Sequence, residues 1–329
     1  MFKRYLIFNK ASIFYPRVLG IYTQHPWVSC PQTAPLKVYI PSEEHMKVST
    51  QLAILEDFRR QSARAMTRQD LSDYLAARRI AWKAPQSLGV DALINLLIEN
   101  DSLKVAEISS DSYGRKARYL VGEVSFLQFA SSFYKGSYLS HGTALHLHGL
   151  ATLGPTFVNH EQSPKNSTSR LTQSGLDRAF RSQQRHSSYV FRYGSRTITF
   201  LNGKNTERAG VMEMRGPNSE PLMVTSLERT LIDVIVRPQY AGGICKVIRA
   251  FEKAKDHVSV PQIAALLAKM KFTYPYHQAL GFVLQKVGMS EESLDPLKDR
   301  KIRFRFYLDY GMKAPAFDPS WKIYYPPDI

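Results

Sequence analysis

The chain has 329 residues, of which 44% are apolar, and this is enough for two domains with ordinary buried cores. The composition excludes a disordered, collagen-like or fibrous protein. Lys and Arg outnumber Asp and Glu by 44 to 28, and the net charge of +16 favours a polyanionic partner, either nucleic acid or an acidic protein. Two cysteines, Cys30 and Cys245, are too few for a disulfide framework, and no apolar run is long enough to cross a bilayer. We therefore expect a cytoplasmic protein with reduced thiols and no membrane contact.

Residues 1–45 differ in character from the rest of the chain. Prolines interrupt them repeatedly, no apolar periodicity lasts two turns, and neither a transit peptide nor a secretory signal is evident. A well-patterned helix begins soon after Met46, and Ser49 or Thr50 can cap it. We expect the native protein to start at Met46 and residues 1–45 to be a non-native or disordered leader.

Residues 46–122 have the pattern of a winged helix. Apolar residues, including Leu52, recur at helical spacing over residues 50–64, and Thr67 with Asp70 forms a capping box for a second helix over residues 67–79. A third helix is predicted over residues 87–100, with Ser87 as its cap. Strands at residues 103–108 and 116–121 flank turn residues and predict a hairpin. Three helices followed by a hairpin is the order of a winged helix, a DNA-binding domain.

The candidate DNA contacts follow from this predicted fold, which places its third helix in the major groove and its hairpin on the phosphates. The third helix has no Lys or Arg and carries Asp91 and Glu99, so neutral side chains would read the bases. The neutral candidates are Gln86, Ser87 and Asn95. The candidate phosphate contacts are Arg78, Arg79, Lys83 and, at the hairpin tip, Arg115, Lys116 and Arg118. The alternative is that these are solvated residues of a winged helix that binds protein.

Three histidines lie in residues 138–150. His141 and His148 are seven residues apart and would share a helix face, but His146 lies off it and the run contains no carboxylate or cysteine. We predict a capped helix that packs its histidines against a sheet, and no metal site.

The remaining segments alternate between strand and helix. Strands are predicted at residues 157–158, 188–192, 197–201, 302–308 and 321–325, and helices at residues 175–185, 225–237, 244–255, 260–270 and 276–287. The fold class is therefore α+β, with an N-terminal winged helix-turn-helix over residues 46–122 and a larger mixed α/β domain over residues 123–329. The net charge is +3 for residues 46–122 and +10 for residues 123–329, so most of the excess lies in the second domain.

Glu228 and Asp233 are the candidate carboxylate pair. An enzyme could use them as acid and base or as metal ligands, and the alternative function is a nuclease-like hydrolase that adds a histidine from residues 141–148. Five residues apart on one helix, however, they point about 140° away from each other. Arg229 and Arg237 are close enough in sequence to neutralise them. We interpret the motif as a structural polar network and expect no enzyme, no catalytic residue and no cofactor.

Several short segments occur in a recognisable order after the predicted winged helix. They are Tyr-Leu-Ser-His at 138–141 with His-Gly-Leu at 148–150, Thr-Ser-Leu-Glu-Arg-Thr-Leu-Ile-Asp at 225–233 with Arg-Pro at 237–238 and Tyr-Ala-Gly-Gly at 240–243, and Leu-Gly-Phe-Val-Leu-Gln-Lys-Val-Gly at 280–288. In this order they resemble the AbiEi antitoxin family, over residues 46–326. The family motif residues, expected to be structural, are His141, His148, Glu228, Arg229, Asp233 and Arg237.

The resemblance implies a function and two partners. Members of this family are antitoxins of type IV toxin-antitoxin systems, which act in abortive infection by phage. The resemblance implies a winged helix that binds operator double-stranded DNA and represses its own operon. It also implies a C-terminal antitoxin domain that counteracts a nucleotidyltransferase toxin, as a functional rather than a stable physical partner.

Overall fold

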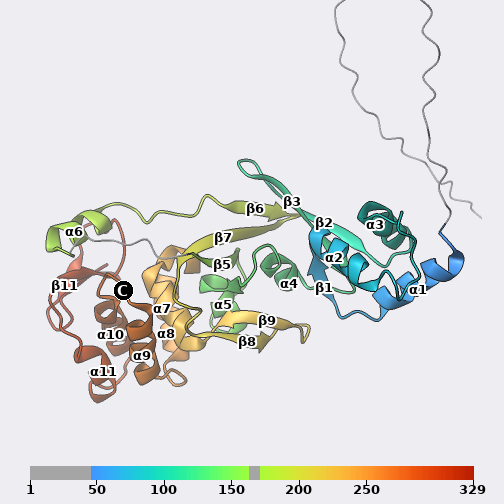
Figure 1. Ribbon diagram of the computed structural model, residues 1–329. Coiled ribbons are helices and arrows are strands. Elements are labelled where there is room, and N and C mark those ends of the chain that lie inside the picture. The colour runs from blue at the N-terminus through green and yellow to red at the C-terminus, as the bar shows by residue number, and fades with distance from the viewer. Residues whose placement is uncertain (1–45, 163–170) are drawn as a thin grey trace, which may run out of the picture. The chain divides into compact units, whose positions relative to one another are not determined.

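The computed structural model describes residues 46–162 and 171–329, which form an α+β fold within one compact unit beginning at Met46 (Figure 1). The expectations for residues 1–45, including Cys30, lie outside the described residues. None of the helices in the described ranges combines the length and the apolar character that a membrane span requires.

The N-terminal part contains the predicted helices and hairpin. Its elements are α1 (Val48–Arg59), β1 (Arg64–Met66), α2 (Arg68–Arg78), α3 (Val90–Glu99), β2 (Lys104–Ser110) and β3 (Gly114–Val121). The three strands pair antiparallel in the order β1-β3-β2, and the helices bury a core that includes Ile54, Leu71, Trp82, Leu93 and Leu97.

Two helix starts in this part differ from the prediction. The N-cap of α1 is Lys47, without a side-chain cap, and Thr50 is buried inside the helix, so the predicted Ser49 or Thr50 cap is wrong. The predicted start of α3 at Ser87 is also wrong, because Arg79 donates hydrogen bonds to the carbonyls of Pro85 and Leu88 and holds that segment as a loop. The capping box of α2, formed by Thr67 and Asp70, is confirmed.

Two further details of α1 were also misjudged. Leu52, expected on its inner face, is 54% exposed. The helix, expected to extend to Arg64, ends at Arg59, and Arg64 instead begins β1, whose Ala65 pairs with Leu120 of β3.

A nine-stranded mixed sheet runs through the middle of the unit, in the order β1-β3-β2-β6-β7-β5-β4-β9-β8. Its further strands are β4 (Tyr138–Leu139), β5 (Thr156–Gln162), β6 (Val190–Tyr193), β7 (Arg196–Lys204), β8 (Val211–Arg215) and β9 (Pro221–Thr225). β5 runs parallel to β7 and β4 parallel to β9, while the other pairs are antiparallel. The helices α4 (Phe126–Ser131) and α5 (His141–Leu147) connect strands of this sheet.

The core of the large sheet contains residues from both predicted domains, before and after residue 122. Phe129, Phe191 and Phe200 pack there with Ala106 and Ile108, which belong to the hairpin. The division into domains at residue 122 stays a prediction, but the hairpin is shared between the two predicted domains.

The C-terminal part is mainly helical. Its helices are α6 (Gln173–Arg181), α7 (Leu227–Val236), α8 (Ile244–Ala254), α9 (Val260–Met270), α10 (Tyr276–Lys286) and α11 (Asp295–Lys298), with short 3-10 turns at Pro238–Ala241 and Glu292–Leu294. The helix α7 contacts α5, α8, α9 and α10, and its residues 228–235 are all buried. A small sheet, in the order β10-β12-β11, is formed by β10 (Phe306–Tyr307), β11 (Ala316–Asp318) and β12 (Ile323–Tyr325). The predicted late strands are therefore present but shorter.

Candidate nucleic-acid interface

The neutral candidates for base contacts are all exposed. Asn95 lies on the solvent face of α3, and Gln86 and Ser87 lie in the loop before it. Asp91, in the first turn of α3, is paired with Arg68 from the first turn of α2 through two short contacts, Nη2 to Oδ2 at 2.8 Å and Nε to Oδ1 at 3.1 Å. The hydrogen bond from Arg68 lowers the pKa of Asp91. The carboxylate expected to repel a phosphate surface therefore has a cation beside it.

The candidate cations divide into free and occupied side chains. The Lys83 side chain is exposed, and Arg115 is exposed with Glu107 at 3.4 Å. Arg78 contacts the Asp57 carboxylate at 3.3 Å, and Arg79 bonds two backbone carbonyls in the loop before α3. Arg79 therefore stabilises the loop that carries Gln86 and Ser87, and Arg78 and Arg115 each have a carboxylate beside them, so the exposed Lys83, which is in no ion pair of the described residues, is the most available candidate for a phosphate contact.

The expected position of Lys116 and Arg118 at the hairpin tip is wrong. Lys116 pairs with Ile108 across the hairpin, Arg118 pairs with Ala106, and the turn itself consists of residues 111–113. The side chains reach toward the large sheet, where neighbouring groups bind them.

Lys116 is held by two tyrosines. Its Nζ donates to the Tyr134 hydroxyl at 2.6 Å and to the Tyr189 hydroxyl at 2.7 Å. Burial alone would lower the pKa of Lys116, but these two phenol oxygens outweigh it and raise the pKa, while the hydrogen bond from Lys116 lowers the pKa of Tyr189. Arg118 donates to the carbonyls of Ser132 and Phe133 at 3.2 and 3.1 Å. Both cations therefore join the hairpin to the segment after α4 rather than face solvent as a pair of phosphate ligands.

The histidines of residues 141–148 bind protein groups, but the predicted cap of their helix is wrong, because its N-cap residue Ser140 makes no side-chain capping bond. His141 is buried at the start of α5, where its Nδ1 lies 2.9 Å from the Ser140 hydroxyl, and burial lowers its pKa to about 4. The Nε2 of His148 donates to the Thr225 carbonyl at 2.8 Å. Within the described ranges, no three His, Cys, Asp or Glu side chains gather in a way that could hold a metal ion.

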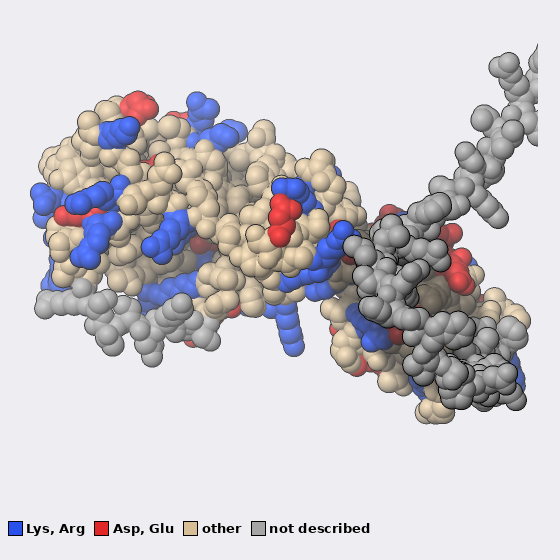
Figure 2. All heavy atoms as spheres, turned by 90° about the horizontal axis from the view of Figure 1, so that it is seen from above, with Lys and Arg blue, Asp and Glu red and all other residues tan. Residues whose placement is uncertain are grey.

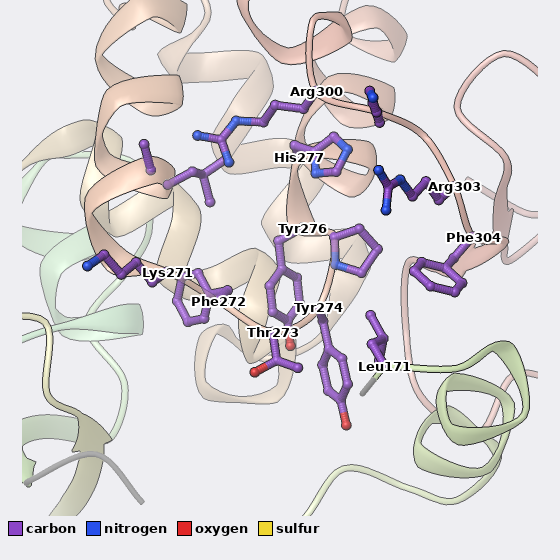
Figure 3. Close-up of a pocket in the computed structure, with 14 residues that line it drawn as sticks. Leu171, Lys271, Phe272, Thr273, Tyr274, Tyr276, His277, Arg300, Arg303 and Phe304 are labelled. Atoms are coloured by element: carbon purple, nitrogen blue, oxygen red, sulfur yellow. The ribbon is translucent and has the colours of Figure 1, made fainter. Parts of the chain in front are cut away.

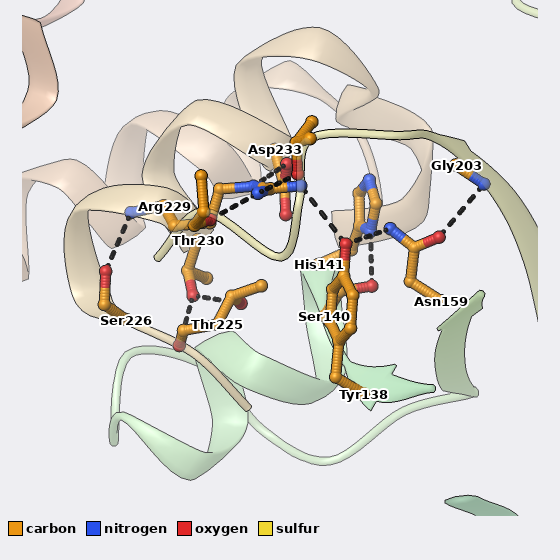
Figure 4. A network of polar contacts seen from close by, with 12 residues as sticks. Tyr138, Ser140, His141, Asn159, Gly203, Thr225, Ser226, Arg229, Thr230 and Asp233 are labelled. Carbon is orange, nitrogen blue, oxygen red and sulfur yellow. Dashed lines mark hydrogen bonds and ion pairs between the residues drawn. The ribbon is translucent and has the colours of Figure 1, made fainter. Parts of the chain in front are cut away.

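Arg229 lies at the centre of a buried polar network (Figure 4). Its Nε donates to Asp233 Oδ1 at 2.9 Å, and its other nitrogens donate to the Thr206 hydroxyl at 3.0 Å and the Tyr138 hydroxyl at 3.3 Å. The Glu161 carboxylate lies 4.0 Å away, and although burial opposes it, hydrogen bonds from Thr206 and Arg208 lower the pKa of Glu161. The network thus contains one cation and two carboxylates.

Sequence reasoning identified Arg229 and Asp233 and included Tyr138 in the Tyr-Leu-Ser-His segment without a role for it, but it missed Glu161. Glu161 stands in β5 among Thr, Asn, His and Gln residues, with only Phe157 and Val158 apolar, so no local pattern marked it as the partner of a buried cation.

The two carboxylates of the candidate enzyme motif do not converge. Glu228 lies 3.4 Å from both the Ser259 backbone nitrogen and the Ser226 hydroxyl, whereas Asp233 faces Arg229. The expected neutralisation by Arg229 is present at Asp233, and the ion pairs of the described residues do not include Arg237. These contacts favour the interpretation of the motif as a structural network.

We find no protein-family model that matches the chain and no curated protein that is similar to it. Among solved structures, the crystal structure of the RV2827C protein from Mycobacterium tuberculosis is similar, with 14% sequence identity and a TM-score of 0.49. The similar region covers 86% of this chain and 94% of that one. A likeness at this level carries no information on function.

Proposed function

We propose that the protein is a DNA-binding transcriptional repressor of the winged-helix type and the antitoxin of a type IV toxin-antitoxin operon. In this proposal α3 enters the major groove, the hairpin of β2 and β3 rests on the phosphates, and residues 123–329 counteract a nucleotidyltransferase toxin.

The observation that carries the DNA-binding part is the exposed polar surface of α3 and the loop before it. Asn95, Gln86 and Ser87 are each exposed, Lys83 precedes them in the chain, and Arg68 offsets the charge of Asp91. Asn and Gln side chains can form paired hydrogen bonds with adenine, so this surface has suitable groups for base contacts despite its lack of cations.

The antitoxin part rests on the resemblance to the AbiEi family. The charge distribution is compatible with it, because residues 123–329 carry a net charge of +10, and Figure 2 shows Lys and Arg side chains outnumbering Asp and Glu on one face of the molecule. An acidic toxin or its nucleic-acid substrate would be attracted to such a surface.

Binding to the DNA upstream of the protein's own gene tests the repressor function. We expect Asn95→Ala and Gln86→Ala to reduce the preference for that DNA over random DNA by about fivefold to a hundredfold. The double variant Lys83→Ala/Arg115→Ala should weaken binding to both DNAs and reduce the salt slope by up to about two. Asn202→Ala, an exposed asparagine on β7, is the matched control. Equal binding of all variants to both DNAs would contradict the assignment of α3 and the hairpin.

Co-expression with the product of the adjacent reading frame tests the antitoxin function. If that product is a toxin, the full chain should restore growth without co-purifying with it, since a type IV antitoxin acts without a stable complex. Continued killing by an adjacent toxin, with the full chain folded and abundant, would contradict the antitoxin assignment while leaving DNA binding untouched.

A further inference from the structure

A basic cavity of about 280 Å³ opens beside the start of α10 (Figure 3). It is lined by the end of α9, residues 271–277 and residues 300–304, and it lies far in sequence from the proposed DNA surface. Its lining includes Lys271, Arg300, Lys301 and Arg303 but no Asp or Glu. The volume is just below the range for small-molecule sites, about 300 to 1,000 Å³.

The cations of this cavity lack acidic partners. Within residues 46–162 and 171–329, no ion pair includes Lys271, Arg300, Lys301 or Arg303. Arg300 uses one nitrogen to donate to the Ala264 carbonyl at 3.0 Å, and its remaining donors are available. Because unpaired cations that share a cavity repel one another, an anion bound between them would be stabilised.

His277 is a second, independent sign of a ligand site. It lies in the first turn of α10 and lines the cavity, and its side chain is only 9% exposed. Its Nε2 has no hydrogen-bond partner among the described residues. In the view of Figure 3 the ring lies between the Arg300 and Arg303 side chains. A buried polar atom without a partner is unfavourable, so a turn of the side chain that brings this atom to a bound oxygen would be favoured.

The N-terminus of α10 adds to the attraction for an anion. Pro275 is the N-cap of this eleven-residue helix and no side chain caps it, but the Tyr276 and Gln278 N–H groups already donate to the Tyr274 and Pro275 carbonyls at 2.9 and 3.0 Å. Backbone N–H groups at a helix start carry a partial positive charge, which favours a phosphate or a carboxylate.

Aromatic rings line the cavity together with the cations. Phe272, Tyr274 and Phe304 are half-buried in its wall. Phe272 and Tyr274 pack against Tyr276, whereas the described part of the chain offers Phe304 no aromatic partner. A planar ring of a ligand could therefore stack on Phe304, as bases stack on aromatic side chains in nucleic-acid binding proteins.

We propose that this cavity binds a nucleoside monophosphate. The phosphate would lie between Arg300, Arg303 and the start of α10, and the base would stack against Phe304. This site is separate from the α3 surface, so its function does not depend on the proposed repressor activity.

Titration calorimetry of the full chain with AMP, adenosine and inorganic phosphate tests the proposal. AMP should bind with a stoichiometry of one, and adenosine and phosphate should each bind at least about tenfold more weakly, because each offers only part of the contacts. Failure of AMP to bind, or binding of phosphate alone as tightly as AMP, would overturn the assignment to a nucleotide.

Variants of Arg303 and Phe304, each with a matched control, test whether these two side chains contact the nucleotide. Arg303→Ala should weaken AMP binding by about tenfold, with partial recovery in Arg303→Lys, and Phe304→Leu by about fivefold to tenfold. Arg249→Ala and Phe317→Leu change an exposed arginine and an exposed phenylalanine outside the cavity and should leave AMP binding unchanged. AMP should also shift the NMR signals of the His277 ring in the unaltered chain. AMP binding that is insensitive to Arg303→Ala and Phe304→Leu and leaves the His277 signals in place would show that the nucleotide lies elsewhere.

Discussion

At the scale of single residues, one guanidinium connects three separate parts of the chain. Arg229 of α7 binds Tyr138 of β4, Thr206 after β7 and Asp233 of its own helix, and it lies near Glu161 of β5. Burial disfavours a charged group, but these partners raise the pKa of Arg229, so the guanidinium stays protonated. Its removal would leave two buried carboxylates without their cation.

We therefore expect Arg229→Ala to lower the free energy of unfolding by about 3 to 5 kcal/mol, because breaking a buried ion pair leaves an uncompensated charge. The double variant Arg229→Met/Asp233→Leu, which removes that pair together, should recover part of this loss. Urea unfolding measures both. A loss for Arg229→Ala no greater than about 1 kcal/mol would show that the network contributes little to stability.

His141 predicts a dependence of stability on pH. Its pKa in the folded protein is about 4 because burial disfavours the charged ring, whereas its unfolded value is 6.5. Below pH 6.5 the unfolded chain takes up a proton that the folded chain does not, so stability is lost as the pH falls from 6.5 toward 4. For one histidine the full loss is about 3 kcal/mol.

Urea unfolding at pH 7 and pH 4.5 measures this effect. The chain should be less stable at pH 4.5, and His141→Asn should show a smaller difference between the two pH values. His277, whose pKa burial also lowers to about 4, provides a similar contribution that remains in the variant. Equal pH differences in the two proteins would rule out His141 as a source of the effect.

At the scale of elements, the sequence pattern predicted long amphipathic helices better than short strands. The apolar stripes of α8, α9 and α10 extend over three turns, and the predicted ranges agree with the structure within a residue or two. β1 was missed because its three residues are specified by pairing with β3, a contact between distant segments that no local pattern contains. The roles of Lys116 and Arg118 were misjudged for the same reason, since Tyr134, Tyr189 and Ser132 are remote in sequence.

The capping box of α2 allows a test on a single helix. Thr67 accepts a hydrogen bond from the Asp70 backbone nitrogen at 3.0 Å, and the Asp70 carboxylate accepts one from the Thr67 backbone nitrogen at 2.7 Å. Thr67→Ala should lower the free energy of unfolding by about 1 kcal/mol, and Thr67→Ser should have little effect. Equal stability of the alanine and serine variants in urea unfolding would contradict a capping role for the hydroxyl.

Gly281 explains part of the Leu-Gly-Phe segment in α10. The ring of Trp321 lies directly against this glycine, so a Cβ there would overlap it, and the Trp321 side chain is fully buried. We expect Gly281→Ala to lower the free energy of unfolding by about 1 to 3 kcal/mol despite the higher helix propensity of alanine. Gly288→Ala in the same segment is not a suitable control, because φ is +92° there. The exposed Ala265→Gly change in α9, which lowers helix propensity without a clash, gives the reference for helix propensity alone, and a gain in stability for Gly281→Ala as large as that reference would contradict the packing argument.

At the scale of the whole molecule, the hairpin of β2 and β3 belongs to two cores. Val121 packs with the helices α1 to α3, whereas Ala106 and Ile108 pack under the large sheet. The sequence predicted the two regions but not this sharing, because the alternation of a strand shows which face is buried and not what covers it.

A fragment of residues 123–329, which lacks the hairpin, tests whether the core of the large sheet needs the hairpin residues. We expect it to unfold at a lower temperature than residues 46–329, because Ile108, which is fully buried, and the Lys116 contacts are removed. A fragment of residues 103–329, which keeps the hairpin, should recover most of the loss. Identical melting temperatures for residues 123–329 and 46–329 would show that the larger region is complete without the hairpin.

The hydrogen bonds from Lys116 to the Tyr134 and Tyr189 hydroxyls have a further consequence for the proposed DNA binding. In many DNA-binding proteins a basic arm is loose in the free protein and becomes ordered only on the duplex, at a cost in conformational entropy. Here Tyr134 and Tyr189 hold strand β3 at Lys116 in the free chain, and the Arg118 bonds to the Ser132 and Phe133 carbonyls hold the same strand two residues further along. In the proposed DNA complex, Arg115 would be presented from a preorganised support, and the ordering cost of that support would be met when the chain folds rather than when it binds.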